Sequence, residues 1–329
     1  MSVAAETERR CEIKDVESVE LPKFLRNNST NVLLSWRTED CHSDQVVKIS
    51  VLHLEYLACQ EYKKDFNIKE LLAEGSSVII EDLHHYSEYR FDLEIGDVKE
   101  QLRMRTSASV PRVRVGLGVI DYDYRDTDTS LSISWRPPPP SDCPLYQSQL
   151  GHYHYQVIGL EDWNSQSHKS GTVPFGQTKL SLNNLLPFSH YNFFVYVTNS
   201  QGEYHHDFFR KFEKRTKVGR PNPPVNLSMT ESGDGMRLFW RTPFPPTGQL
   251  GSFEIAQSSL ENSDIEMKIV RVEDTVSIRG TFSINMNSLK PSRKYSIKIR
   301  SFNKNYQEAS DWSDEIEYEI QENGSRSVF

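Results

Sequence analysis

The stretch Leu185-Leu-Pro-Phe-Ser-His-Tyr-Asn-Phe-Phe-Val-Tyr-Val197 decides the fold of this chain. Its apolar side chains recur at every second position from Tyr191 to Val197, which predicts a β-strand with one face toward a core. The preceding Leu-x-Pro-x-Ser-x-Tyr motif is typical of a turn that enters a strand with a Tyr at the corner. Such a Tyr buries its ring while its hydroxyl reaches back to upstream backbone, as in Greek-key β-sandwiches.

Two further copies of this pattern line up with the first, residue by residue. They run from Leu83 to Leu93 and from Leu289 to Ile299. A Trp in an alternating strand precedes the corner Tyr of every copy; the pairs are Trp36 and Tyr89, Trp135 and Tyr191, and Trp240 and Tyr295. The members of these pairs lie 53, 56 and 55 positions apart. A period of about one hundred residues with two fixed core anchors per copy predicts three tandem domains of one kind.

The repeated pattern resembles the fibronectin type III domain. The middle copy matches that family through Trp135, the prolines at 137–140, Tyr155-Gln-Val157 and the corner from Leu185 to Tyr191. The third copy matches through Pro223-Pro-Val, Trp240, Pro245-Pro-Thr-Gly248, Phe253-Glu-Ile255 and its own corner. The resemblance implies an all-β chain of three tandem immunoglobulin-like β-sandwiches in an elongated array. Each domain is expected to have seven short antiparallel strands in two sheets, ABE and CFG.

The first copy departs from the family pattern at two places. His85 stands where the corner has its Pro, and residues 52–75 carry an apolar pattern that could also form a helix. Two alternatives, strand or helix, therefore remain for this segment.

The sequence also gives expected boundaries. We place the three domains at residues 13–109, 110–217 and 218–320, after a flexible lead at 1–12 and before a polar tail at 321–329. The first linker is the segment from Thr106 to Pro111. The second, from Lys217 to Pro224, is rich in proline, which predicts a semi-rigid extended joint.

Charge and hydropathy limit the class of protein. The formal net charge of −8 argues against a general nucleic-acid binder. No apolar run reaches the ~18 residues of a membrane-spanning helix. The segment from Met1 to Glu20 is charged and shows no signal peptide. Because the domains that this chain resembles are mostly extracellular, we expect an ectodomain fragment or a product whose leader is missing, with a cytoplasmic protein as the alternative.

Four cysteines allow three full pairings. Cys41 and Cys59 fall in one domain and are the expected disulfide, with Cys11 and Cys143 free or paired elsewhere. Four free thiols in a reducing compartment are the alternative. Four N-glycosylation sequons are compatible with secretion; they are at Asn27, Asn28, Asn226 and Asn323.

Motifs of catalysis and of metal binding do not occur in the sequence. It lacks a phosphate-binding Gly loop, H-E-x-x-H, G-x-S-x-G, C-x-x-C and kinase signatures. His152 and His154 alternate on the expected strand C and could share a metal, but two imidazoles with no third placed ligand make a poor site. We therefore expect no enzyme activity, no cofactor and no metal.

The remaining candidate for function is a surface of the middle domain. Alternation on strands C and F leaves one set of side chains outside, and strand G adds basic residues nearby; the proposed partner-binding residues are His152, His154, Phe194, Tyr196, Arg210 and Lys211. Aromatic side chains beside arginine are typical of protein interfaces. The alternative is that a neighbouring domain covers these aromatics.

A second feature lies in the third domain. Ser310-Asp-Trp-Ser-Asp314 resembles half of the doubled W-S-x-W-S motif of cytokine-receptor modules. In that family the Trp rings stack with strand F arginines. Trp312 is therefore expected to contact Lys298 and Arg300 through cation–π interactions, in a structural role.

Two functions follow from these observations. The first is an extracellular receptor or adhesion ectodomain that binds a protein ligand or a cell-surface partner. Tandem domains of this kind are similar to those of receptor tyrosine phosphatases, receptor kinases and cytokine receptors. The second is an intracellular scaffold that uses the sandwiches as spacers. Glycosylation at Asn226, or oxidation of Cys41 and Cys59, favours the first.

Overall fold

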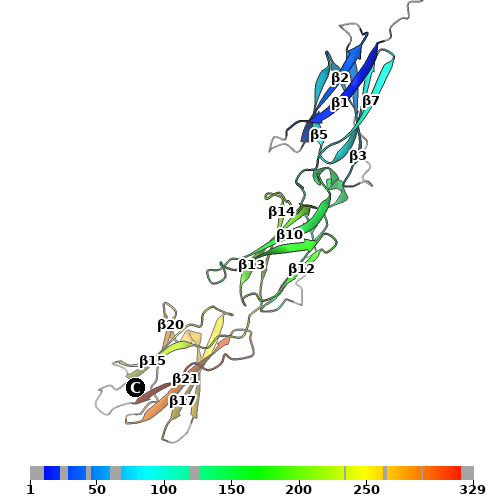
Figure 1. Cartoon of the computed structure of the whole chain (residues 1–329). Helices are drawn as coiled ribbons and strands as arrows, with labels where there is room; N and C mark the ends of the chain where they lie inside the picture. Colours follow the sequence, from blue (N-terminus) through cyan, green and yellow to red (C-terminus); the bar gives the residue numbers. More distant parts are fainter. Residues whose placement is uncertain are drawn as a thin grey trace, which may run out of the picture.

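The computed structural model describes residues 11–22, 29–41, 46–59, 68–118, 126–232, 235–261, 265–290 and 292–319. In these ranges the regular secondary structure is nearly all β-strand, and every strand pair is antiparallel. Six sheets pack in pairs as three sandwiches, which follow one another in an elongated array (Figure 1). The fold class expected from the repeated Trp and Tyr anchors is confirmed.

The first sandwich has a three-stranded and a four-stranded sheet. The first sheet has the order β1 (Glu12–Glu20), β2 (Ser29–Glu39), β5 (Ser77–His84), and the second β4 (Ile68–Ala73), β3 (Val47–Tyr56), β6 (Ser87–Ile95), β7 (Val98–Arg105). Strands β3 and β4 occupy most of the described part of residues 52–75, so the helical alternative is wrong there. Residues 60–67 lie outside the described ranges.

The middle sandwich repeats this arrangement. Its sheets have the orders β12 (Lys179–Leu182), β9 (Leu131–Arg136), β8 (Gly116–Leu117) and β11 (His168–Pro174), β10 (Leu150–Gly159), β13 (His190–Asn199), β14 (Phe209–Arg215). A 3-10 helix, η1 (Pro140–Leu145), lies between β9 and β10.

The third sandwich has two four-stranded sheets. Their orders are β15 (Val225–Ser232), β16 (Gly235–Arg241), β20 (Thr281–Asn285), β19 (Val276–Ile278) and β18 (Ile265–Arg271), β17 (Leu250–Ser259), β21 (Lys294–Asn303), β22 (Ile316–Glu319). The short 3-10 helix η2 (Val272–Asp274) joins β18 to β19. The expected CFG sheet thus gains a fourth strand at one edge in all three sandwiches, namely β4, β11 and β18.

Each sandwich encloses its own apolar core, because alternate side chains of both sheets point inward. Strand β6 shows the alternation without interruption, burying every second residue from Ser87 to Ile95. The three anchoring tryptophans are buried at the centres of these cores, with exposed fractions of 4% for Trp36, 3% for Trp135 and 0% for Trp240. The spacing of Trp and Tyr therefore identifies core positions correctly.

All three tyrosine corners are present. The corner hydroxyl accepts a hydrogen bond from the backbone N–H five residues upstream in each case; the pairs are His84 to Tyr89 at 2.7 Å, Leu186 to Tyr191 at 2.9 Å and Lys290 to Tyr295 at 3.0 Å. The first corner forms with His85 in place of Pro. The hydroxyl thus fastens the turn before strand F to the strand itself.

Tyr191→Phe is expected to destabilise the middle sandwich by about 1 kcal/mol. The change removes the hydroxyl that accepts from Leu186 N–H but keeps the ring, which is 1% exposed. Hydrogen-exchange mass spectrometry of β13 peptides measures the free energy of opening. An unchanged opening free energy would count against a stabilising role of the corner.

The cysteine pairing differs from the expected one. Cys41 pairs with Cys11, and Cys59 pairs with Cys143. The expected Cys41–Cys59 disulfide is wrong because the 10 residues of β3 lie between them in the chain, which separates the two ends by about 30 Å. Cys11 instead lies beside Cys41, since Glu12 pairs with Glu39 at the ends of β1 and β2.

The Cys59–Cys143 disulfide joins the first sandwich to the middle one. Cys143 belongs to η1 and is 1% exposed. Backbone hydrogen bonds continue the junction: Ser109 N–H donates to Gln147 O at 2.7 Å, and Arg112 N–H donates to Leu145 O at 2.9 Å. The first expected linker is thus attached to the domain that follows it.

The junction between the middle and third sandwiches is also hydrogen-bonded. Gly219 N–H donates to Thr247 O at 2.8 Å, and the side chain of Asn303 donates to Gly219 O at 3.0 Å. On the other side, Lys217 N–H donates to Thr127 O at 3.0 Å. Lys217 and Gly219, two positions apart in this joint, therefore bond to different sandwiches.

Candidate protein-binding face of the middle sandwich

The candidate surface is the outer side of the four-stranded sheet of the middle sandwich. Residues directly opposite one another in neighbouring strands share a face. His154 is opposite Tyr196, Gln156 is opposite Phe194, and Tyr196 in turn is opposite Phe209. The strand register thus places His154, Phe194 and Tyr196 on one outer face, as the alternation predicts.

Tyr196, however, is not available to a partner. Its side chain is 7% exposed, because Tyr204 from the β13–β14 loop and Phe209 from β14 pack against it at ring-centroid distances of 4.7 and 5.7 Å. Tyr204 also stacks on His154 at 4.7 Å with an interplanar angle of 16°. We call His154, Tyr196, Tyr204 and Phe209 the aromatic cap. The expectation that Tyr196 is exposed is wrong because its own domain covers it.

Phe194 remains half-buried beside the aromatic cap. Its ring contacts Phe209 at 5.3 Å, and Lys211 lies opposite it on β14. Lys211 and His152 are exposed, so an apolar ring with a basic neighbour is accessible from solvent at this place.

Arg210 does not belong to this face. It lies opposite Val195, whose side chain is in the core, and its guanidinium donates to Val115 O at 3.2 Å. Adjacent residues of a strand point to opposite faces, so Arg210 and Lys211 cannot share one. The inclusion of Arg210 in the partner-binding set is therefore wrong.

The aromatic cap disfavours the charged form of His154. Burial lowers the pKa of His154 below its ordinary value of 6.5, and the nearby His206 lowers the pKa further. A depressed histidine pKa means that the unfolded chain binds the proton more readily than the folded chain. Its contribution to stability is present above pH 6.5 and is lost as the pH falls below that value.

An ion pair that no sequence motif indicates lies on the inner side of β14. Lys214 is bonded to Asp126, and its Nζ also donates to Ser132 O at 2.7 Å. The side chains of Lys214 and Asp126 are only 13% and 10% exposed. The available signal was the position of Lys214, two residues after the inward-facing Phe212, which places a charge at a core-facing position.

In the third sandwich, Trp312 lies where the sequence predicts. Its ring is 5.3 Å from Lys298 Nζ and 4.6 Å from Arg300 Cζ. The hydroxyls of the flanking Ser310 and Ser313 accept hydrogen bonds from N–H groups of β21 at 2.9 and 3.0 Å. The segment is thereby fastened to the strand. Glu254, which sequence analysis did not identify, is opposite Arg300 and forms an ion pair with it.

Arg300→Ala removes both the cation beneath Trp312 and the partner of the Glu254 carboxylate, and the contact with Trp312 is expected to account for about 0.5 to 2 kcal/mol of the lost stability. The same change in a Trp312→Ala background should cost less. Opening free energies of β21 peptides from hydrogen exchange measure both effects. Strictly additive effects in this double-mutant cycle would show that the contact between Arg300 and Trp312 does not contribute to the free energy of unfolding.

The comparison with known families agrees with this geometry. The model of the fibronectin type III domain matches residues 123–207 and 222–319, which together are more than half of the chain. The chain belongs to the fibronectin type III family. Both matched regions contain a Trp and Tyr anchor pair and a tyrosine corner.

Two proteins illustrate what this fibronectin type III chain is similar to. It is 27% identical over 129 residues to neural cell adhesion molecule L1 of Takifugu rubripes, an alignment that covers 37% of the chain. The alignment spans 10% of that relative. Among solved structures, the FN1-FN3 domains of chicken CNTN1 match at 16% identity and a TM-score of 0.37, over 95% of this chain and 97% of that one.

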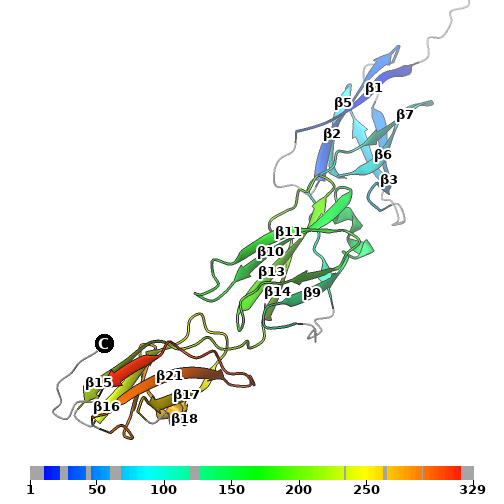
Figure 2. The same ribbon diagram turned by 60° about the horizontal axis from the view of Figure 1, so that its bottom comes forward.

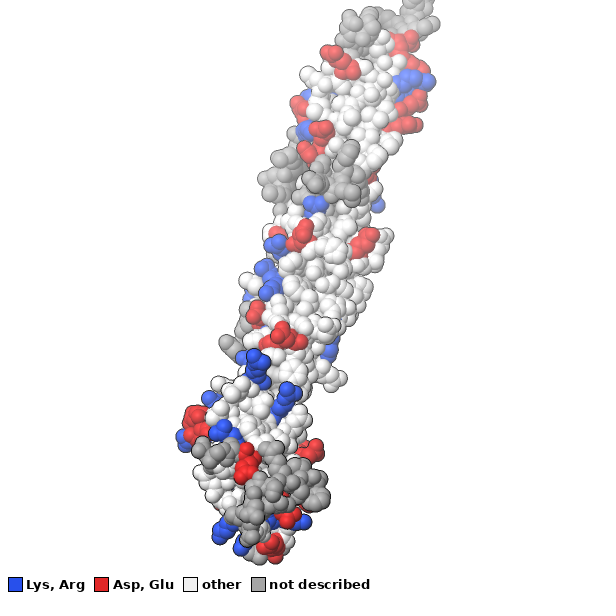
Figure 3. All heavy atoms as spheres, turned by 90° about the vertical axis from the view of Figure 1, so that its left-hand side faces the viewer, with Lys and Arg blue, Asp and Glu red and all other residues white. Residues whose placement is uncertain are grey.

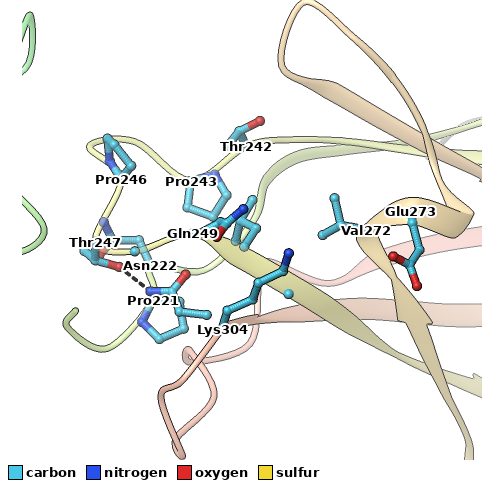
Figure 4. A pocket seen from close by; sticks show the side chains of 14 residues that line it. Pro221, Asn222, Thr242, Pro243, Pro246, Thr247, Gln249, Val272, Glu273 and Lys304 are labelled. Atoms are coloured by element: carbon cyan, nitrogen blue, oxygen red, sulfur yellow. Dashed lines mark hydrogen bonds between the residues drawn. The ribbon is translucent and has the colours of Figure 1, made fainter.

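A cavity of about 410 Å³ lies at the end of the third fibronectin type III sandwich nearest the middle one (Figure 4). Most of the residues that line it are in loops, among them Pro221 and Asn222 of the joint, Pro246, and Lys304. The Asn222 side chain donates to Pro245 O at 3.0 Å, and Asn303 donates to Thr247 Oγ1 at 3.0 Å. These bonds hold the lining residues at the junction of the two sandwiches, so we interpret the cavity as a structural feature of that junction.

In the described ranges, no three or more His, Cys, Asp and Glu side chains are grouped so that they could hold a metal ion. No helix in those ranges has the length and apolar character that crossing a membrane requires. Charges of both signs are interspersed over the face shown in Figure 3.

Proposed function

We propose that this fibronectin type III chain is a non-catalytic protein-binding array of a cell-surface receptor or adhesion molecule. The observation that carries the proposal is the pairing of all four cysteines in two disulfides. Disulfides persist in the oxidising environment outside cells and are rare in the cytosol. The local similarity to a neural cell adhesion molecule supports the same class of protein.

The disulfides also distinguish this proposal from an intracellular scaffold. Asn226 lies on β15 in an Asn-x-Ser sequon and is exposed, so a glycosyltransferase can reach it. The other sequon asparagines, Asn27, Asn28 and Asn323, lie outside the described residues. Peptide mapping of the protein from its native source, without reduction, tests the compartment. Recovery of four free thiols and an unmodified Asn226 would favour the scaffold.

The proposed binding site is the outer face beside the aromatic cap, centred on Phe194 and Lys211, with His152 and His154 at its edge. Phe194 offers a rigid apolar contact, and Lys211 gives a basic rim that favours an acidic partner surface. The equivalent outward positions of the first sandwich carry charged residues such as Asp92, which are typical of an ordinary solvated surface.

The binding test uses the full chain, clustered on beads and applied to intact cells before and after trypsin treatment of their surface. We expect trypsin to abolish binding, and Phe194→Ser with Lys211→Glu to reduce binding at least tenfold, because both the apolar contact and the basic rim are lost. Asp92→Ser, at the matching position of the first sandwich, should bind as the unmodified chain does. Equal binding by the Phe194 and Lys211 variant would reject this face.

A further inference from the structure

The free edge of one sheet in the third sandwich carries an unusual apolar stripe. Among the described residues, strand β18 is the outermost strand of its sheet and pairs with β17 alone (Figure 2). Ile265, Met267 and Ile269 alternate along it and are 67%, 48% and 69% exposed. Large apolar side chains on an open edge strand are a template for pairing with another strand. The described residues of this chain leave these three side chains exposed to that extent.

The backbone of β18 shows which residues are available at that edge. Leu260 N–H donates to Lys294 O at 3.1 Å, so Leu260 directs its backbone groups toward β21. Backbone groups alternate in direction along a strand, so the even-numbered residues of β17 also direct theirs toward β21. The odd positions of β17, such as Ile255, direct theirs to β18, where Ile255 is opposite Lys268. Ile265, Met267 and Ile269 therefore point their N–H and C=O groups away from β17, toward solvent.

The sequence Ile265-Glu-Met-Lys-Ile269 is self-complementary when two copies run antiparallel. If Met267 is opposite Met267 of a second copy, Ile265 is opposite Ile269, and Glu266 is opposite Lys268 on both sides of the axis. Both charged residues are exposed. This register also places the outward-pointing backbone groups of the two copies against one another, as antiparallel hydrogen bonding requires.

Neighbouring registers lack this match. A shift by one residue sets an outward-pointing backbone group against an inward-pointing one. A shift by two residues sets either Glu266 against Glu266 or Lys268 against Lys268, and like charges directly opposite are unfavourable. A lone lysine on an edge strand normally opposes pairing. Here Glu266 compensates Lys268 in the symmetric register.

We infer that β18 pairs with β18 of a second copy of this chain, about a two-fold axis at Met267. The pairing joins two four-stranded sheets into one continuous sheet and brings the two apolar stripes together on its outer face. This inference stands independently of the proposed binding face, which lies on the middle sandwich. Because the contact is short, we expect a weak dimer whose population depends on protein concentration.

Sedimentation equilibrium of the full chain over a range of concentrations tests the charge match. The unmodified chain should show a monomer–dimer equilibrium. Lys268→Glu should raise the dissociation constant at least tenfold, because it places a second carboxylate opposite Glu266 of the other copy. The charge exchange Glu266→Lys with Lys268→Glu should restore association. A monomer at every concentration up to about 1 mM, or an unchanged dissociation constant for Lys268→Glu, would overturn the inference.

A matched pair of substitutions tests the apolar stripe. Ile269 on β18 and Ile278 on β19 have the same exposed fraction of 69%. Ile269→Thr should weaken the dimer, whereas Ile278→Thr should leave the dissociation constant unchanged. Equal effects of the two substitutions would point to general adhesiveness and would contradict a β18 contact.

Cross-linking tests the register and needs no stable dimer. All four native cysteines are in disulfides, so Met267→Cys introduces a single thiol. Hydrogen-bonded antiparallel partners have Cα atoms about 5.5 Å apart, within disulfide range. Ile265→Cys is the control, since its symmetry mate would lie about 14 Å along the strand. We expect rapid covalent dimer formation by Met267→Cys only; equally fast formation by Ile265→Cys would overturn the register.

Discussion

Lys214→Met is expected to destabilise the middle sandwich by about 3 to 5 kcal/mol. Lys214 forms an ion pair with Asp126 between the two sheets, and both side chains are almost buried. Met occupies a similar volume, but among the described residues it leaves the buried Asp126 carboxylate with the Ser132 N–H alone as its hydrogen-bond donor, at 2.8 Å. Removing one partner of a buried pair costs more than the pair itself contributes, because the remaining charge is uncompensated.

The same strand offers a control of the same residue type. Lys211 forms an ion pair with Glu213 at 3.5 Å, with side chains 46% and 55% exposed, so Lys211→Met should change stability by less than about 0.5 kcal/mol. Opening free energies of β13 and β14 peptides from hydrogen exchange measure both variants in the full chain. Equal effects of the two substitutions would show that burial does not determine the strength of the Lys214 pair.

The fold could be predicted because its signals are local. A period of two fixes the inward face of each strand, and the interval between a corner Tyr and its upstream donor is five residues in all three sandwiches. Trp135 and Tyr191 are therefore assigned to the core without knowledge of which strands pair. The edge strands β4, β11 and β18 were not assigned to either expected sheet, because they carry no comparable anchor.

The candidate site could be predicted only in part because it depends on contacts between distant segments. Alternation places Tyr196 on the outer face, but it cannot tell that Tyr204, in the following loop, folds back over it. The error at Arg210 has a different cause. Strand G had no fixed phase in the sequence, and a shift of one residue moves a side chain to the opposite face.

The cysteine pairing shows the same limit. Closeness in sequence favoured Cys41 with Cys59, whereas strand direction decides the distance between them in space. The β3 strand carries the chain from one end of the first sandwich to the other, where Cys59 meets Cys143 of the next domain. A disulfide between domains can be predicted only when the relative placement of their loops is known.

Trp240→Ala is expected to destabilise the third sandwich by about 3 to 5 kcal/mol, the range for loss of a large buried aromatic side chain. Trp240 is 0% exposed and packs against Phe253 at 5.0 Å and Phe282 at 6.1 Å, one ring from each sheet. Among the described residues its indole N–H has no hydrogen-bond partner, so the expected loss is one of packing. A loss of this size is a large fraction of the stability of a domain, which is about 5 to 15 kcal/mol.

A second tryptophan of the same sandwich separates core packing from surface stacking. Trp312→Ala removes a ring that stacks on Lys298 and Arg300 outside the core, so its cost should be about 0.5 to 2 kcal/mol. Hydrogen exchange of β17 and β21 peptides reports both variants, and β6 peptides of the first sandwich serve as an internal reference in the same sample. We expect Trp240→Ala to increase exchange throughout the third sandwich and to leave the β6 peptides unchanged. Similar losses for the two tryptophans would mean that Trp240 is not the anchor of the core that its position in the repeat indicates.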